Sequence, residues 1–313
     1  ISALNWMSSS GYIEMEKFLF SNGYRFSDTS NTNRPAFTPV YEILFKQRNG
    51  QLSAADANAQ IDALKNYDVR NDMKKYLYRS SFNQQYALNF SGGAKNLAYN
   101  FSAGLDNNLS ELGASYRRLS LRSGNVFSPL KNLRISVNIE LSQGRSESGR
   151  PSYQSITYNG SSLYPYAQLA GANGDPLAIV KSLRQPYKDT AGAGKLLDWN
   201  YYPLDDYKHS QTTTIIDHWL ANLGIQYSFL SNVELVLKYQ LEKQSLSGNT
   251  LNDVNSYAAR DLINRFSQLN RSTGVVKYIV PYGDILYQSG ADIFSQNLRG
   301  QVNYNKAWAK NKI

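Results

Sequence analysis

The chain has 313 residues and no cysteine, and its 33 Lys and Arg residues outnumber 24 Asp and Glu residues, which gives a formal net charge of +9. The absence of cysteine excludes a disulfide scaffold and thiolate metal sites. The mean hydropathy is −0.49. No run of about 18 apolar residues occurs, which excludes transmembrane helices but not membrane-spanning strands, whose apolar residues recur at every second position.

The basic residues are spread along the chain, and no run of them is longer than a pair such as Lys74-Lys75. Nucleic-acid binding requires a concentrated basic stripe or patch, so nucleic acid is not an expected partner. A basic surface beside phosphate-bearing lipid head groups, or a basic pore wall, explains the excess charge equally well.

Residues 1–82 are predicted to be a helical region. Ser8-Ser9-Ser10 precedes an amphipathic stretch, Tyr12 to Phe20, and Gly23 follows it, which indicates a helix with a polar start and a glycine stop. A second helix is predicted to begin at Ser53, whose side chain would pair with Asp56 in an N-terminal cap. Its buried face would carry Ala57, Ile61 and Leu64.

From about Asn83 onward, apolar residues recur at every second position, which is typical of strands with one apolar and one polar face. The strongest alternation lies at residues 97–105, 133–141, 221–229 and 233–241. Weaker copies pass through Tyr86 to Phe90, Leu119 to Leu121, and Leu298 to Tyr304. The pattern predicts about seven strands.

Alternation alone does not separate a membrane barrel from a soluble sandwich, because both bury one face of each strand. These predicted strands run for about ten residues or more, whereas strands of globular proteins average about five or six. The polar face is rich in Asn, Ser, Gln and Gly, which suits a water-filled lumen. Both features favour the barrel.

The lengths of the connections favour it further, because tight turns alternate with long loops, as in outer-membrane barrels with their long loops outside the cell. The tight turns are expected at 92–96, 128–132 and 231–232. The longer connections are expected at 107–114, at about 143–211 and at about 243–293.

The predicted fold is therefore an all-β, antiparallel transmembrane β-barrel segment formed by residues 83–313, with residues 1–82 as an extracellular helical loop region. The first strand runs from that region towards a tight turn, which puts the region on the long-loop side. About seven strands leave an open sheet, and each unpaired backbone group in hydrocarbon costs several kcal/mol. Because the sequence also begins at Ile1 without a start methionine, we expect it to be an internal piece of a longer protein.

Several stretches, taken in order along the chain, resemble the SusC/RagA family of TonB-dependent outer-membrane transporters of Bacteroidota. The stretches that carry the resemblance are Tyr12 to Tyr24, Asp68 to Asp72, Gln84 to Gly93, Leu197 to Trp199, Tyr202 to Leu204, and Asn297 to Asn305.

The resemblance implies a bacterial outer-membrane protein with a 22-stranded barrel and an N-terminal plug, in contact with outer-membrane lipid and lipopolysaccharide. It also implies a SusD-like surface lipoprotein as a lid, energy from the TonB complex, and oligosaccharide or oligopeptide cargo. The chain departs from the family pattern because no plug, no TonB-contacting segment and no terminal strand ending in an aromatic residue is recognisable. The expected function is active nutrient uptake. The alternatives are a structural barrel that scaffolds a surface complex and a soluble β-rich glycan-binding module.

No constellation of catalytic residues is found, so we predict no enzyme, no cofactor and no metal site. His209 and His218 have no neighbours at metal-ligand spacing. The stretch Gly192 to Lys195 lacks the first glycine and the final Ser or Thr of a phosphate-binding loop. Asp205-Asp206, and Asn249 with Asn252-Asp253, could contribute to a calcium site or form solvated turns.

The best candidate for substrate binding is the aromatic-rich loop between the fourth and fifth predicted strands, because rigid rings stack on sugars or peptide side chains at low entropic cost. The candidate residues are Tyr153, Tyr158, Tyr164, Tyr166, Trp199, Tyr201 and Tyr202. The alternative is that these rings pack the loop against itself or against the lid, because so long a loop needs a core of its own.

A second candidate set consists of basic residues on the polar face of the strands, where they would line the pore. They are Arg118, Arg122, Arg134, Lys238 and Arg299. The alternative is that they pair with carboxylates of a plug.

Overall fold

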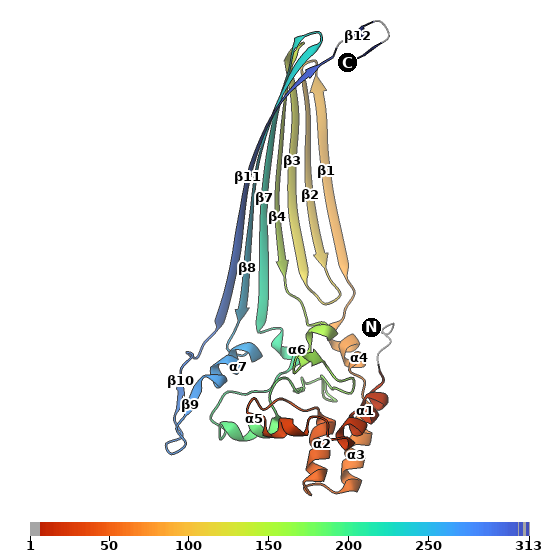
Figure 1. Cartoon of the computed structure of the whole chain (residues 1–313), viewed down its shortest axis with the longest axis vertical. Coiled ribbons are helices and arrows are strands. Elements are labelled where there is room, and N and C mark those ends of the chain that lie inside the picture. The colour runs from red at the N-terminus through yellow and green to blue at the C-terminus, as the bar shows by residue number, and fades with distance from the viewer. Residues whose placement is uncertain (1–6, 306, 309–310, 313) are drawn as a thin grey trace.

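The structure of the protein is a computed structural model, which describes residues 7–305, 307–308 and 311–312. A long antiparallel sheet of seven strands stands on a body of helices and loops at one of its ends (Figure 1). Neighbouring strands in the sheet follow chain order. They are β1 (Phe82–Ala94), β2 (Leu97–Leu109), β3 (Ser115–Leu130), β4 (Leu133–Glu147), β7 (Ser210–Leu230), β8 (Val233–Asn252) and β11 (Ile285–Tyr304).

The connections are sorted by length between the two ends of the sheet, as predicted. Two-residue turns at 95–96, 131–132 and 231–232 join the strands at the end opposite the body. The short strands β12 (Ala307–Trp308) and β13 (Asn311–Lys312) lie at that same end (Figure 1). All longer segments lie at the other end. The main strands have 13 to 21 residues, which is two to four times the average of about five or six in globular proteins.

The two long loops are shorter than predicted, because the strands that flank them are longer. They span residues 148–209 and 253–284, whereas the alternating pattern predicted about 143–211 and 243–293. Some of the additional paired residues, such as Gln143 to Glu147 and Ser247 to Asn249, are polar or small on both faces of the sheet. Backbone pairing continues there after the alternation of side-chain polarity has ended, so the period-two signal could not detect it.

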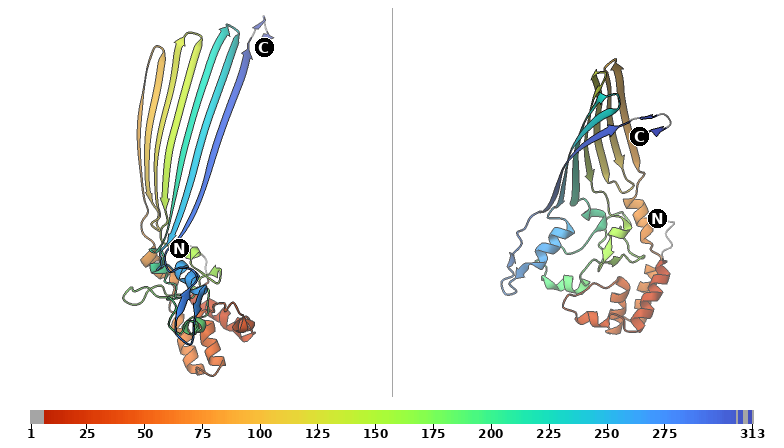
Figure 2. Two further views of the ribbon diagram at one scale, coloured as in Figure 1. Left: turned by 90° about the vertical axis from the view of Figure 1, so that its left-hand side faces the viewer. Right: turned by 45° about the horizontal axis from the view of Figure 1, so that its top comes forward.

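The sheet is a single layer, and neither of its faces is covered by another part of the described chain (Figure 2). The buried hydrophobic clusters contain no residue of the seven main strands, and large apolar side chains on the strands are exposed, with Leu88 at 70% and Leu298 at 72%. A sandwich would bury one face of such a sheet against a second sheet. That arrangement is absent among the described residues.

The body at the end of the sheet, which we call the cap, consists of residues 7–81, 148–209 and 253–284. Its N-terminal part contains α1 (Ser9–Ser21), the 3₁₀ turn η1 (Phe26–Ser30), α2 (Pro39–Arg48), α3 (Ala54–Leu64), α4 (Val69–Asp72) and the π-helical turn η2 (Met73–Leu77). The two long loops add η3 (Tyr153–Ser155), β5 (Thr157–Tyr158), β6 (Ser161–Ser162), α5 (Gln185–Ala191), α6 (Pro203–Asp206), α7 (Tyr257–Arg265), β9 (Ser267–Leu269) and β10 (Val276–Tyr278).

Both predicted helices, α1 and α3, are present, and each begins directly after a serine that caps its first turn. Ser8 caps α1 by accepting a hydrogen bond from the Gly11 amide, and Gly23 follows the helix with a φ of 75°. Ser53 caps α3 and exchanges hydrogen bonds with the backbone and carboxylate of Asp56. No helix among the described residues is long and apolar enough to span a membrane.

One hydrophobic core joins the N-terminal helices to the 148–209 loop. Ile13 of α1, Val40 of α2 and Ile61 of α3 pack together with Leu163 and Tyr166 of the loop. Residues 7–81 and the 148–209 loop are thus a single packed body rather than two independent regions.

Candidate functional site

The two faces of the sheet differ in chemistry, and the pairing register shows which side chains lie level. Val137, Leu223, Tyr239 and Leu298 form one row across β4, β7, β8 and β11. The next residues along these strands form a row on the opposite face, which includes Asn138, Asn222, Gln240 and Asn297. Four strands therefore present apolar side chains to one side and amides to the other.

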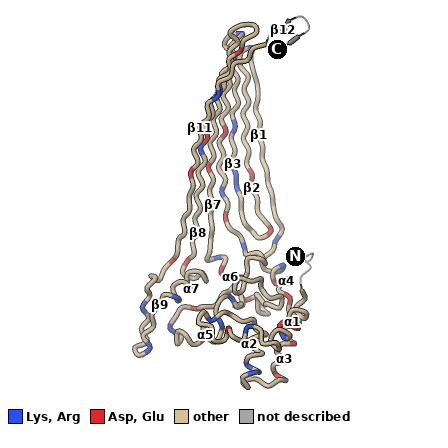
Figure 3. Tube along the Cα trace, in the orientation of Figure 1, with Lys and Arg blue, Asp and Glu red and all other residues tan. Residues whose placement is uncertain are grey.

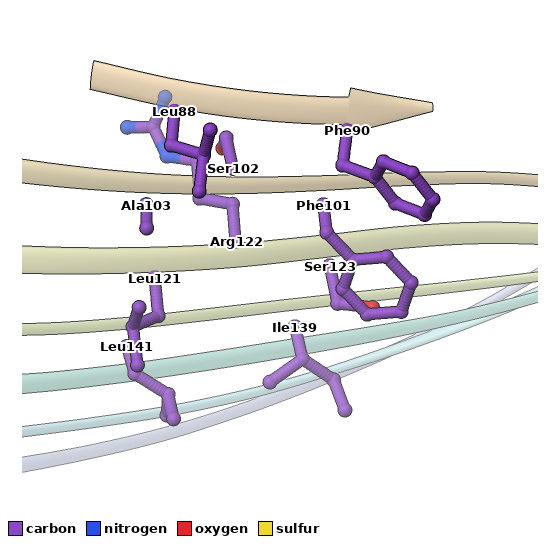
Figure 4. Close-up of a pocket in the computed structure, with 10 residues that line it drawn as sticks. All are labelled: Leu88, Phe90, Phe101, Ser102, Ala103, Leu121, Arg122, Ser123, Ile139 and Leu141. Carbon is purple, nitrogen blue, oxygen red and sulfur yellow. The ribbon is translucent and has the colours of Figure 1, made fainter. Parts of the chain in front are cut away.

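The apolar face carries a shallow groove of about 280 Å³ between large side chains (Figure 4). Phe90 of β1 and Phe101 of β2 lie side by side there, and Ser123 of β3 separates Phe101 from Ile139 of β4. Along β4 the apolar positions run from Leu133 to Leu141, and Gln143 follows them. At about 3.4 Å per residue this is about 27 Å of strand, or about 20 Å along the axis of a barrel whose strands tilt by about 40°. Outer-membrane barrels have an apolar band of about 25 Å.

The edge of the apolar band is not level across the sheet. Tyr86, Leu105 and Leu119 of the first three strands lie in the same row as Gln143, Asp217, Ser245 and Asp292 of the last four. The band therefore ends closer to the turns on the β11 side than on the β1 side. Such a stagger is expected when strands are tilted relative to a flat apolar layer.

The polar face holds the five basic residues that were predicted to line a pore. Arg118 lies opposite Asp106, at 2.7 Å between their charged atoms, and Arg122 lies opposite Glu140, at 2.9 Å. These two arginines are thus neutralised by carboxylates of the neighbouring strands within the sheet itself. Figure 3 shows such charges scattered along the strands.

The other three basic residues have no acidic partner within the described part of the chain. Lys238 and Arg299 are direct cross-strand neighbours, and Arg134 lies on the same face, two residues nearer the turns. Like charges opposite one another destabilise a sheet unless an anion or water screens them. Lys238 and Arg299 also line a groove of about 320 Å³ on the polar face. That the five residues line a pore stays a prediction.

The aromatic residues predicted to bind substrate are, with one exception, buried in the cap. Six rings are exposed by 8% or less, and Tyr202 is half-buried. The buried rings are Tyr153, Tyr158, Tyr164, Tyr166, Trp199 and Tyr201.

The buried rings are tied into the cap by their polar atoms. Tyr153 donates to the Leu163 carbonyl at 2.7 Å, Tyr158 accepts from Arg25 at 2.8 Å, and the Trp199 indole donates to Asp261 at 2.8 Å. The rings therefore serve as the core that a long loop needs. Contact of any of them with cargo stays an untested prediction.

Glu16 joins three segments of the cap, a role that the sequence did not reveal. Its carboxylate is 3% exposed and accepts hydrogen bonds from Thr38 at 2.6 Å and from Tyr166 at 2.7 Å. Burial raises the pKa of Glu16 to about 7, although both hydrogen bonds and the charge of Arg25 act in the opposite direction. Glu14, two residues away on α1, instead faces solvent beside Lys65.

The cap should consequently lose stability as the pH rises. The folded-state pKa of Glu16 lies above the ordinary value of 4.5. The stability that protonated Glu16 gives the cap is therefore fully present below about pH 4.5 and is lost as the pH rises through about 7. A pKa difference of this size between the folded and unfolded protein corresponds to a loss of at most about 3 kcal/mol in the free energy of unfolding. Hydrogen-exchange protection of the α1 amides, corrected for intrinsic rates, should fall across this range.

Glu16→Gln should remove most of that pH dependence, because the amide can accept from Thr38 and donate to Tyr166 without ionising. Glu14→Gln is the matched control, and it should leave the decline in α1 protection in place. An unchanged decline in the Glu16→Gln protein would show that another group controls the titration.

The remaining polar candidates have structural partners. His209 bonds to Asp253 at 2.8 Å, and His218 to Glu242 at 3.0 Å. Asp206 accepts a hydrogen bond from the Tyr257 amide, and Asp205 accepts one from the Lys208 ammonium at 3.0 Å. Within the described residues, no three His, Cys, Asp or Glu side chains are placed to hold a metal ion.

No protein-family model and no curated protein matches the sequence. Three solved structures of one transport system do match the fold. The RagAB peptide importer in its closed-closed state aligns with a TM-score of 0.55 at 13% identity over 89% of this chain. Its open-open state aligns with a TM-score of 0.54 at 14% identity over 90% of this chain, and the RagAB peptide transporter with 0.53 at 14% over 90%.

In each case the match covers 31% of the neighbour's chain. The likeness extends over both the sheet and the cap, since about nine-tenths of the residues align. These neighbours are transporters rather than enzymes, and the chain has the fold of about a third of a RagAB importer chain.

Proposed function

We propose that the chain forms part of the barrel wall and of the extracellular cap of an outer-membrane importer. The single observation that carries this proposal is the open, one-layer sheet with a continuous, uncovered apolar band on one face and an amide-rich opposite face. Exposure of so large an apolar surface to water is unfavourable, whereas contact with lipid tails is not. The staggered edge of the band supports an arrangement in which the strands are tilted relative to the axis of a barrel.

Oligopeptides are the favoured cargo over oligosaccharides. The support for peptides is the likeness to peptide importers, which reaches this chain only through its fold. Under this proposal the cap meets a SusD-like lipoprotein outside the cell, and the TonB complex supplies energy through parts of the protein beyond this chain. Lipid and lipopolysaccharide surround the apolar band.

Uptake by living cells tests the proposal. Cells with the intact gene should accumulate a radiolabelled oligopeptide, and a strain without the gene should not. A protonophore should abolish the accumulation, because TonB-linked transport draws on the proton gradient. Binding of the peptide to cells at 4 °C provides the control for surface adsorption.

The two rival functions predict different results. A scaffold would leave peptide uptake unchanged in the deletion strain. A soluble glycan-binding module would be secreted or purified without detergent. Either result would overturn the proposed importer.

A further inference from the structure

A polar groove of about 490 Å³ opens in the cap where three segments far apart in the sequence meet. Figure 1 shows α5, α7 and β9, which border it, gathered on one side of the cap. Its rim carries Arg34, Arg265 and Arg271, and Tyr187, Trp199 and Asn264 contribute to its wall. No Asp or Glu is among the residues that line it.

The wall is held together by hydrogen bonds that do not depend on a ligand. Asn264, which is 3% exposed, accepts from the Leu197 amide at 3.0 Å and donates to the Leu197 carbonyl at 2.9 Å. Asp261 binds Trp199 through one oxygen and Arg265 through the other, each at 2.8 Å. The groove is therefore pre-formed, and little ordering entropy would be lost on binding.

The position of Arg34 is fixed as well. Its carbonyl accepts from the Arg184 amide at 3.1 Å, and the neighbouring Pro35 pairs with Leu183. Its guanidinium lies over the Tyr187 ring, 4.7 Å from the centroid. This stacking leaves the edge of the guanidinium, with its fork of N–H donors, available to a ligand.

The charge of the groove is not balanced within it. Asp261 neutralises Arg265, but Arg34 and Arg271 have no carboxylate within ion-pair distance in the part of the chain that the structure describes. Both are exposed, Arg34 after η1 and Arg271 in the turn between β9 and β10. Two guanidinium groups thus face one groove without acidic partners.

We propose that this groove binds the carboxylate groups of a short acidic oligopeptide. Arg34 and Arg271 each bind one carboxylate, and the Tyr187 ring lies against the peptide between them. The guanidinium fork matches a carboxylate in a two-point hydrogen bond. A volume of about 490 Å³ lies within the range of about 300–1,000 Å³ for ligand pockets. The inference rests on the proposed function for the choice of peptide over other carboxylate-bearing oligomers.

Calorimetric titration of the detergent-solubilised, full-length protein tests the inference. The probe is an acetylated hexapeptide of alternating Glu and Ala, and its partner is the amidated peptide with Gln in place of Glu. The acidic peptide should bind more tightly than the Gln peptide. The double variant Arg34→Gln, Arg271→Gln should weaken binding of the acidic peptide by about tenfold or more and leave the Gln peptide unaffected.

The matched control removes two exposed lysines of the cap that do not line the groove, as Lys46→Gln with Lys277→Gln. This variant has the same net charge as the double arginine variant and should bind the acidic peptide as the parent protein does. Arg271→Lys, which keeps the charge but loses the fork, should show a smaller loss than Arg271→Gln.

Equal weakening by the lysine control would overturn the proposal, since it would indicate a general field effect instead of a site. Unchanged binding in the double arginine variant would also overturn it. Tighter binding of oligogalacturonate than of the acidic peptide would overturn the assignment to peptides. If the protein binds the acidic peptide through both arginines but does not import it, the proposed importer function is overturned. The assignment of the groove as a binding site for acidic peptides then still holds.

Discussion

Under the proposed function, Leu223→Arg is expected to destabilise the protein in a lipid bilayer by about 2–4 kcal/mol, because it places a charge on the apolar face near the middle of the band. Leu223 lies in the row of Val137 and Tyr239, and the nearest rows on the same face, two residues away in each direction, are also apolar across β4, β7 and β8. The measurement is the free energy of unfolding in urea of the full-length protein in phospholipid vesicles. Resistance of the folded form to SDS at room temperature gives a second readout.

Asn222→Arg is the matched control, because Asn222 is the preceding residue on the same strand and faces the other side of the sheet. In a water-filled lumen the added charge should change stability by less than about 1 kcal/mol. If Asn222→Arg were the damaging change and Leu223→Arg were tolerated, the two faces would be reversed. Equal tolerance of both variants would contradict a membrane-embedded sheet.

Tyr166→Ala is expected to destabilise the cap by about 3–5 kcal/mol while leaving the sheet folded. The Tyr166 ring is 1% exposed and packs against Tyr164, with 4.8 Å between ring centroids. Its removal leaves a cavity among three segments and takes one hydrogen bond from the buried carboxylate of Glu16. Hydrogen exchange should accelerate in the cap amides and stay slow in the sheet.

Two variants give this experiment its controls. Tyr67→Ala makes the same chemical change at a ring that is 43% exposed, and it should leave exchange in the cap nearly unaltered. Tyr166→Phe keeps the ring and removes only the hydroxyl, at a cost of about 1–3 kcal/mol. That cost should grow as the pH rises and Glu16 ionises. Unaltered exchange in the Tyr166→Ala cap would contradict the packing described here.

The sequence alone determined the sheet and the sorting of its connections. The alternation from Leu133 to Leu141 is a local property, because successive side chains of a strand always point to opposite faces. The caps at Ser8 and Ser53 were equally predictable, because each hydrogen bond joins residues three apart. The cap of helix α7 at Ser256 is a local signal of the same kind, because its hydroxyl accepts from the amide of Ala259.

Only the tertiary structure decided which polar and aromatic groups are covered. Nothing in the sequence around Tyr166 and Trp199 indicates whether their rings are buried in a core or exposed to bind cargo. Glu16 is buried because α1, α2 and the 148–209 loop converge on it, and Glu14 on the same helix remains in solvent. Arg34 and Arg271 likewise line one groove only because distant segments pack together. Helix capping and strand pleating depend on residues that are close in the chain, so a local sequence pattern predicts them. Burial depends on how distant segments pack together, and a local sequence pattern does not predict this packing.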